Sequence, residues 1–201
     1  RTPDGVRVPV RLSLPGLHNV WNATAAIAAL AEAGVAPAES ARALESFAGI
    51  ARRMQRLAER DGSLLLDDYA HHPTEVAAVL AAARRLPGIA RVIAIYQPHQ
   101  HGRTRRHLAD FAEVLARADY VLVPDIFSAR ETEEERRSVS AGDLVAAIAT
   151  RGGRAEFVPA TADLVARVAA LLSPGTLVLT MGAGDVHRIA EAIRKALFER
   201  A

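Results

Sequence analysis

The sequence predicts an α/β fold in which helices cover both faces of a mostly parallel β-sheet. Strand-like and helix-like segments alternate through most of the 201 residues. Several strand-like runs, such as ARVIAIYQP at 90–98 and GTLVLTMG at 175–182, are mainly apolar, as expected for strands buried on both faces. These two observations favour a Rossmann-like sheet, in which ligands bind at loops beyond the carboxyl ends of strands.

The first 50 residues are expected to form a separate, mainly helical piece. Residues 6–14 (VRVPVRLSL) alternate apolar and polar side chains, which predicts a half-buried strand. Residues 19–34 predict a helix that ends at a glycine. Residues 36–49 predict a second helix, with a proline near its start and a glycine past its end. We expect a domain boundary between 49 and 55.

The α/β part is expected to begin with a β-hairpin, because Asp61-Gly62 suits a tight turn between residues 54–60 and 63–68. The remaining elements follow in alternation. Strands are expected at 90–98, 119–127, 155–159 and 175–182, and helices at about 74–85, about 104–118, 140–152, 162–172 and 185–198. A charged stretch at 128–139 precedes the helix at 140–152.

Composition excludes several classes of protein. The chain has no cysteine, which removes disulfides, thiolate catalysis and cysteine-based metal sites and fits a reducing, cytoplasmic location. Aromatic residues make up only 4% and the net charge is +2, so a nucleic-acid partner is not expected. No apolar run reaches the roughly 20 residues of a membrane helix, so no membrane partner is expected.

Two polar pairs lie near the expected domain boundary or in the helical piece. Asn19 and Asn22 are three residues apart, so on a helix they project to the same side, where their amides could read an adenine edge. Asn19 could equally be a helix cap. The adjacent Arg52 and Arg53 could clamp a phosphate or form a solvated pair.

The segment DDYAHHPTE, residues 67–75, follows an expected strand and admits more than one interpretation. Asp68 stands at the strand end, where a carboxylate can accept hydrogen bonds from ribose hydroxyls. Pro73, Thr74 and Glu75 have the chemistry of a helix start, with Thr74 as a possible cap. A metal site is a further alternative, formed by Asp67, Asp68, His71 and His72. Adjacent histidines on an extended chain point apart, which argues against the metal site.

Two further loops follow expected strands. The loop YQPHQHGRTRRH contains His99 and Arg103, and its positive charge suits a carboxylate or phosphate substrate, with a solvated basic loop as the alternative. The glycines of GAGD, residues 182–185, could bring backbone N–H groups to an anion. Close packing of a strand and a helix also selects glycines, so this signal is weak.

Taken together and in order, these segments resemble the Mur ligases of peptidoglycan synthesis. The resemblance is carried by PGLHNVWNATAAIAA, FAGIARRMQRL, DDYAHHPTEVAAVLAAAR, YQPHQHGRT, ADYVLVPDIFSARE and MGAGD, and it covers essentially the whole chain. It implies that residues 1–50 are the end of a central ATP-binding domain and residues 51–201 a C-terminal α/β domain. Gln100 and His101-Gly102 depart from residues common in the family, but neither departure touches His99 or Arg103.

The resemblance implies an ATP-dependent amide ligase of cell-wall synthesis. In that family a substrate carboxylate is phosphorylated to an acyl phosphate, which the amino group of an amino acid attacks. The segments favour the branch that uses UDP-N-acetylmuramate and L-alanine as substrates. ATP and Mg²⁺ are the implied cofactors, and the rest of the ligase, with its N-terminal and central domains, is the implied partner.

Site residues carry over by position. The residues implied to bind ATP are His18, Asn19, Asn22, Arg53 and Asp68, with Arg53 reaching the phosphates across the domain interface. The residues implied to line the amino-acid and acyl-phosphate side are Tyr69, His71, His72, His99 and Arg103. Of all these, the catalytic ones are expected to be Arg53, His72, His99 and Arg103.

One feature of the family is missing from the sequence. No G-x-x-x-x-G-K-[ST] phosphate loop occurs in the 201 residues, and the family's magnesium ligands belong to the same central domain, so no metal ligand is expected in this chain. We therefore expect the 201 residues alone not to catalyse ligation. The alternatives are a murein tripeptide ligase of cell-wall recycling, a metal-dependent hydrolase built on the Asp/His cluster and His99, and a nucleotide- or dinucleotide-binding module built on Gly182, Gly184 and Asp185.

Overall fold

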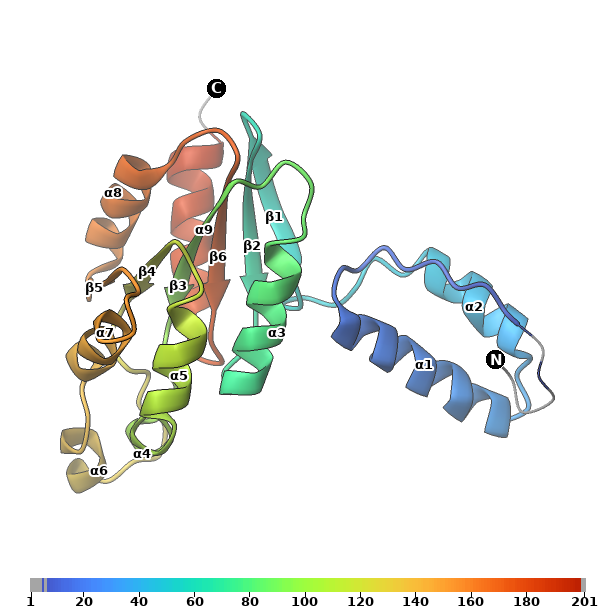
Figure 1. Cartoon of the computed structure of the whole chain (residues 1–201), viewed down its shortest axis with the longest axis horizontal. Helices are drawn as coiled ribbons and strands as arrows, with labels where there is room; N and C mark the ends of the chain where they lie inside the picture. Colours follow the sequence, from blue (N-terminus) through green and yellow to red (C-terminus); the bar gives the residue numbers. More distant parts are fainter. Residues whose placement is uncertain (1–4, 6, 200–201) are drawn as a thin grey trace. The chain divides into compact units, whose positions relative to one another are not determined.

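The computed structural model describes residue 5 and residues 7–199 (Figure 1). Its internal contacts divide the chain into two compact units, Arg1–Ala51 and Arg52–Ala201. This division lies one residue beyond the predicted end of the helical piece. Each unit is described by itself below.

The first unit is mainly helical. Helix α1 (Leu17–Glu32) packs against helix α2 (Pro37–Glu45), which begins with its proline at the first helical position. The strand predicted at 6–14 is wrong for the described residues 7–14, which are irregular, whereas Val6 lies outside the described residues. Alternation cannot make a strand without a neighbour to pair with, and in the described part of this unit residues 7–14 have none.

The second unit contains a six-stranded sheet in the order β1-β2-β6-β3-β4-β5. The strands are β1 (Gln55–Arg60), β2 (Ser63–Asp68), β3 (Arg91–Tyr96), β4 (Tyr120–Val123), β5 (Ala155–Phe157) and β6 (Thr176–Met181). Among the strands of the described residues, only β1 and β2 pair antiparallel, through a turn in which Asp61 and Gly62 have φ of 49° and 73°. All other pairs are parallel, so the predicted fold class is confirmed.

Helices cover both faces of this sheet (Figure 1). Helices α3 (Pro73–Ala83), α5 (Leu108–Leu115) and α7 (Ala141–Ala149) pack on one face, where one core cluster forms. Helices α8 (Thr161–Leu171) and α9 (Val186–Ile193), extended by a π-helical turn at Arg194–Phe198, pack on the other face around a second cluster. The chain returns across the sheet through α8 to place β6 between β2 and β3.

The helix predicted at about 104–118 is instead two helices. Helix α4 (His101–Arg106) starts earlier than expected, and the chain turns at His107, with φ −110° and ψ 20°, before α5 begins. The break lets α4 follow the loop after β3 while α5 lays Phe111 and Leu115 into the core. The charged stretch contains a further short helix, α6 (Glu133–Arg137), capped by Thr132.

Parallel strands place the loops that follow them at one end of the sheet. Here these segments are residues 69–72, 97–103 (which include the first turn of α4), 124–131 and 182–185, after β2, β3, β4 and β6, and we call them the carboxyl edge. The opposite end, where β3, β4 and β5 begin, is called the amino edge. In Figure 1 the carboxyl edge is the lower end of the α/β unit. Among the described residues, no helix has both the length and the apolar character to cross a membrane.

Candidate functional site

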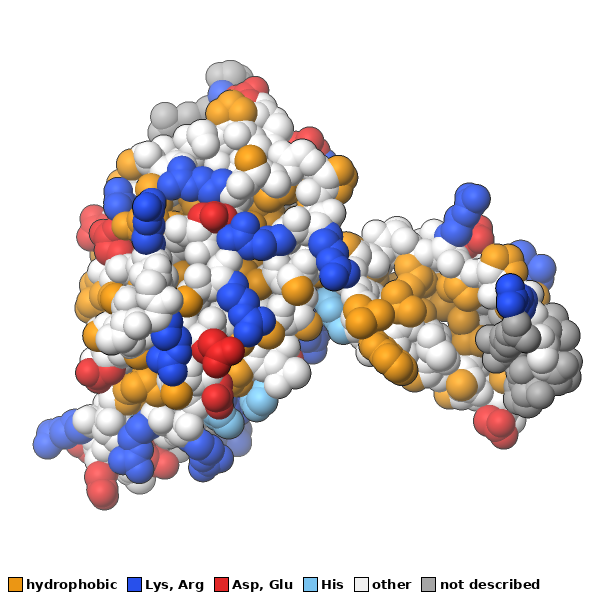
Figure 2. Space-filling model, viewed as in Figure 1, with side chains coloured by type: hydrophobic (Ala, Val, Ile, Leu, Met, Phe, Trp, Pro, Cys, Tyr) orange, Lys and Arg blue, Asp and Glu red, His pale blue; other side chains and the backbone are white. Residues whose placement is uncertain are grey.

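Aromatic and imidazole rings from three loops form a row at the carboxyl edge. The ring centroids of Tyr69 and His71 are 5.3 Å apart, and those of His71 and His99 are 6.4 Å apart. His99 then stacks on Phe127 at 5.5 Å with an interplanar angle of 13°. The structure thus brings together Tyr69, His71 and His99, three of the predicted site residues. Figure 2 shows histidine side chains gathered at this lower end of the unit.

Buried polar atoms beside this row have no hydrogen-bond partner among the described residues. They include His99 Nδ1 and Arg103 Nη1, two further predicted site atoms, and also Gln97 Oε1 and the Tyr96 hydroxyl. A buried polar atom without a partner costs free energy, so a cluster of them marks a place where a ligand or water completes the bonding. All belong to the last residue of β3 or to the loop and helix that follow it.

The electrostatics of this cluster favour a neutral imidazole at His99. Burial lowers the pKa of His99 first, and the positive charges of Arg103 and His71 lower it further, against a smaller opposite effect of Glu131. Burial also raises the pKa of Tyr96 well above its usual value. At neutral pH the cluster therefore offers an arginine cation, a neutral imidazole and a protonated phenol.

The two neighbouring arginines at the start of the unit have different surroundings. Arg52 donates to Asp67 at 3.2 Å and to the backbone carbonyls of Gly182 and Gly184, and its guanidinium lies 4.8 Å from the centre of the Tyr69 ring. Arg53 is exposed, with its guanidinium 5.6 Å from the same ring. Arg52 is thus bound within the fold, and Arg53 is the one that remains accessible.

The two aspartates at the end of β2 are nearly inaccessible. Asp67 accepts hydrogen bonds from Arg52 and from the hydroxyl of Thr180. The Asp68 carboxylate accepts the backbone N–H groups of Met54, at 2.8 Å, and Ala70, at 2.7 Å. Asp68 therefore ties the start of β1 to the loop after β2, and its predicted contact with a ribose stays a prediction.

The adjacent histidines of DDYAHHPTE also have different roles. His71 joins the ring row, and its Nδ1 lies 3.0 Å from the Tyr69 carbonyl. His72, rather than Thr74, is the cap of α3, since its Nδ1 accepts the Thr74 N–H while Glu75 accepts the His72 N–H. The exposed His72 ring contacts His107, at 5.1 Å. The structure does not bring His72 into the row.

The glycines of GAGD allow close packing. A Cβ on Gly182 would lie 2.7 Å from the Gln97 carbonyl, and one on Gly184 would lie 2.6 Å from both Gln97 Oε1 and the Phe127 ring. The Gly182 N–H is bonded to the Asp68 carbonyl. These glycines thus bring the loop after β6 against the loops after β3 and β4, and no anion cradle is needed to account for them.

The predicted adenine contacts lie in the first unit, on or beside α1. Asn19 donates from its side chain to the Pro15 carbonyl at 2.7 Å, one turn back along the chain. His18 is half-buried and Asn22 is exposed. Asn19 therefore has a local structural role, whereas Asn22 offers a free amide face.

The donor set in the described residues does not fit a resident metal ion. No group of three or more His, Cys, Asp or Glu side chains lies together there in a way that could hold one. In particular, the two aspartates of DDYAHHPTE bond within the fold and His72 points to His107. No step of the chemistry below is derived through a metal on these residues.

Comparison with known proteins identifies a family that matches this chain. Residues 52–184 match the family described as Mur ligase, glutamate ligase domain. The chain belongs to the Mur ligase family. The match spans the hairpin and the loops of the carboxyl edge as far as Gly184.

Individual proteins with sequences similar to this Mur ligase chain are consistent with that family. A UDP-N-acetylmuramate–L-alanine ligase from Kineococcus radiotolerans is 42% identical over 197 residues, which are 98% of this chain and 41% of that protein. The ligase of the same name from Agrobacterium fabrum is 42% identical over 187 residues, 92% of this chain and 39% of that protein. The Mur ligase chain thus spans about two fifths of the length of these relatives.

Solved structures resemble it as well. The UDP-N-acetylmuramate–alanine ligase of Thermotoga maritima has a TM-score of 0.77 at 28% identity, covering 96% of this chain and 40% of that one. A murein peptide ligase of Psychrobacter arcticus has a TM-score of 0.67 at 27% identity, covering 96% of this chain and 39% of that one. Both support the Mur ligase fold.

Three residues at the carboxyl edge of this Mur ligase chain were not predicted from the sequence: Tyr96, Phe127 and Glu131. Arg52 was considered only as one of a pair of arginines. Arg52 was indistinguishable from Arg53 by type and position. Tyr96 and Phe127 stand at the ends of strand-like runs, where an aromatic residue predicts only core packing. Glu131 lies in a charged stretch that carries no local sign of its contact with residues thirty positions earlier.

Proposed function

We propose that the chain is the C-terminal part of an ATP-dependent ligase that joins L-alanine to UDP-N-acetylmuramate in peptidoglycan synthesis, in the cytoplasm. The single observation that supports it most is the pairing of buried, unpartnered Arg103 and His99 atoms with the Tyr69–His71 row, in a chain whose relatives carry that enzyme name. ATP and Mg²⁺ are the proposed cofactors, with the magnesium ligands in another domain of the ligase.

In the proposed reaction, ATP phosphorylates the lactyl carboxylate of UDP-N-acetylmuramate. The amino nitrogen of L-alanine then attacks the acyl carbon, the bond from that carbon to the phosphate oxygen breaks, and inorganic phosphate leaves. The amine must lose a proton to form the amide. Little covalent chemistry is left to this chain, so its task is to position the amine and to balance charge.

Arg103 is proposed to bind the carboxylate of L-alanine. Its buried Nη1 lacks a partner, and a guanidinium fork matches the two oxygens of a carboxylate. Holding the carboxylate there would place the α-amino group beside the His71–His99 pair. His99, kept neutral by burial and by Arg103, is suited to accept the proton that the amine gives up.

The remaining predicted residues, with the exception of His72, keep their roles as proposals. Arg53, exposed beside Tyr69, is proposed to meet the phosphates, and His18, Asn19, Asn22 and Asp68 to contact the nucleoside. Tyr69 and His71 are proposed to line the amino-acid side. His72 is proposed to act indirectly, by capping helix α3.

The test is an assay of the ligase that contains this sequence. Incubated with UDP-N-acetylmuramate, ATP, Mg²⁺ and L-alanine, it should form ADP, phosphate and the alanyl product in equal amounts, and omission of L-alanine should abolish product. The 201 residues alone should form none. Absence of alanyl product with the ligase would refute the proposed function.

A murein peptide ligase is the second candidate, because the Psychrobacter arcticus enzyme of that name shares this fold at 27% identity. The two candidate functions differ in the amine substrate. The ratio of kcat/KM for L-alanine to kcat/KM for the murein tripeptide decides between them, and a value above one favours the alanine ligase. The residue geometry favours neither a metal-dependent hydrolase nor a dinucleotide module.

A further inference from the structure

The loop that carries His99 and Arg103 is held by a distant segment, residues 124–131 after β4. The Phe127 N–H donates to the Pro98 carbonyl at 2.8 Å, and the Gln100 N–H donates to the Phe127 carbonyl at 2.9 Å. These bonds form a parallel bridge between His99 and Phe127 that continues the pairing of β3 with β4. The Phe127 ring lies flat against the His99 ring.

Glu131 fixes the other side of the same loop. One carboxylate oxygen accepts the Gly102 N–H at 3.1 Å, and the other lies 2.9 Å from His101 Nδ1. The side chain of Glu131 is 4% exposed and that of His101 is 13% exposed. Burial alone would raise the pKa of Glu131, but the bonds from His101 and Gly102 outweigh it and leave that pKa below its usual range.

The held loop is strained. Gln100, which precedes α4, has a φ of 68°, and Arg130, next to Glu131, has a φ of 56°. A residue other than glycine in this region is strained and persists only where the surroundings impose it. The bonds to Glu131 and the buried Thr104, whose hydroxyl donates to the Gln100 carbonyl at 2.8 Å, supply that constraint. Arg103 lies in the same first turn of α4.

We propose that Glu131, acting through His101 and the first turn of α4, is a positioning residue that sets where Arg103 and His99 meet the amino-acid substrate. This rests on the proposed function, which assigns that substrate to the two residues. Glu131 itself touches no reacting atom. Phe127 supports the same loop from the His99 side.

The first experiment measures kinetics in the ligase that contains this sequence. Glu131→Ala should raise KM for L-alanine by about tenfold, as expected for loss of charge-assisted hydrogen bonds, while KM for ATP stays within about twofold. Glu131→Gln, which keeps the acceptor for Gly102, should give an intermediate KM. A merely structural loss would reduce the active fraction and hence kcat, and would leave both KM values unchanged.

Asp143→Ala is the matched control. Asp143 is another carboxylate with a lowered pKa, caused by its bonds to the N–H and hydroxyl of Ser140, and it caps α7 away from the loop. This variant should lose carboxylate hydrogen bonds at the start of a helix without changing KM for L-alanine. An unchanged KM in Glu131→Ala, or a rise in both KM values, would overturn the proposal.

A second experiment does not depend on activity. In the 201-residue chain, Glu131→Ala and His101→Ala should each accelerate amide hydrogen exchange at Gly102–Thr104 and shift the NMR signals of the His99 ring, and the double variant should add little to either single one. Asp143→Ala should change neither. Unchanged exchange in both variants would overturn the proposal, whereas failure of the wild-type ligase with L-alanine would count against the proposed function alone.

Discussion

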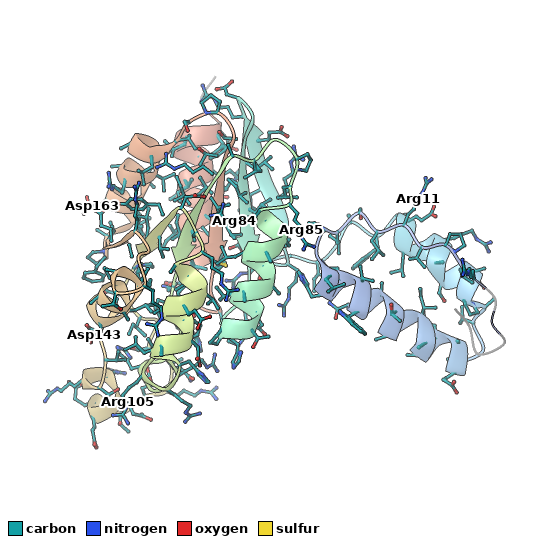
Figure 3. The ribbon with its side chains drawn as sticks, in the orientation of Figure 1. Arg11, Arg84, Arg85, Arg105, Asp143 and Asp163 are labelled. Carbon is teal, nitrogen blue, oxygen red and sulfur yellow. The ribbon has the colours of Figure 1, made fainter. Side chains whose placement is uncertain are left out.

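The two ends of the parallel sheet handle their polar groups in opposite ways. At the amino edge lies an open groove of about 480 Å³ lined by Ala90, Arg91, Ala116, Ala118, Asp119, Gly152, Gly153 and Arg154. There the polar groups bond to one another: Asp119 accepts from the Val92 N–H and from Arg84, and Arg91 donates to the Leu171 carbonyl. Arg84, near the end of α3, and Arg105, on α4, mark the two edges in Figure 3.

At the carboxyl edge, by contrast, buried atoms of Tyr96, Gln97, His99 and Arg103 have no partner among the described residues. An open groove thus lies at the edge whose polar groups bond to one another. We therefore use the buried polar atoms without a partner, and not the presence of a groove, to place the proposed substrate site at the carboxyl edge.

The largest expected effect is on activity at the carboxyl edge. Arg103→Met in the ligase should lower kcat/KM for L-alanine about 100- to 1,000-fold, the range for loss of a charge-stabilising donor. Its free energy of unfolding should not fall, because the buried Nη1 has no partner to lose. Arg84→Met at the amino edge is the control and should leave kcat/KM within about twofold; equal losses in both variants would erase the contrast between the edges.

The next largest expected effect is a difference in stability between variants of the neighbouring Arg52 and Arg53. Arg52→Met should lower the free energy of unfolding by about 3 kcal/mol, because it leaves Asp67, which is 2% exposed, without its cation. Arg53→Met should change stability by less than about 0.5 kcal/mol, because that side chain is exposed, yet it should impair activity. Urea denaturation of the two variants measures the difference, and similar stability losses would contradict the assignment.

A smaller loss of stability is expected at the amino edge. Asp119→Ala removes the acceptor for the N–H of fully buried Val92 and should cost about 1–3 kcal/mol. Activity measured well below the unfolding temperature should stay within about twofold of wild type. A tenfold fall in kcat/KM with intact folding would show that this edge also serves the reaction.

The pH dependence of stability provides a further test of the carboxyl edge. The pKa of His99 lies below its ordinary value of 6.5, chiefly through burial, so between the two values the unfolded chain binds more protons than the folded one. Stability from this group is complete above pH 6.5 and is lost as pH falls through the lowered pKa. His99→Gln should flatten this part of the stability curve, and NMR titration of the imidazole should give a midpoint below 6.5; a midpoint above it would refute the neutral His99.

The smallest expected effect is a difference in stability between variants of two tyrosines. Tyr96→Phe should leave stability unchanged or raise it by up to about 1 kcal/mol, because its buried hydroxyl has no partner. Tyr120→Phe, at the amino end of β4, should lower it by about 0.5–1.5 kcal/mol, because that hydroxyl bonds to Glu156 and Arg167. Thermal unfolding of both variants tests the pair, and the opposite order would contradict the comparison.

Much of the α/β unit follows from local sequence. The hairpin at Asp61-Gly62, the strands and the alternation with helices were predictable because each signal lies within a few residues. The strand at 6–14 failed because alternation does not supply a partner, and the break at His107 escaped because both halves have helical composition.

The candidate site was predictable to the level of loops. Tyr69, His71, His99 and Arg103 stood after strands, and parallel strands bring such loops together. What divides Arg52 from Arg53 is tertiary, namely which side chain meets Asp67. His72 caps α3 through local bonds with Thr74 and Glu75, whereas the contact of His71 with His99 is tertiary. Glu131 shows the same limit, since its partners are thirty residues away.

The most direct test of the two-edge account observes both edges in one molecule. In the ligase labelled with ¹⁵N-arginine, with ATP and UDP-N-acetylmuramate analogues bound, L-alanine is added and the side-chain signals are followed. The Arg103 guanidinium signals should shift and become protected from exchange with water, while those of Arg84 and Arg91 should stay in place. Unchanged Arg103 signals at saturating L-alanine, or shifts confined to the amino edge, would contradict the two-edge account.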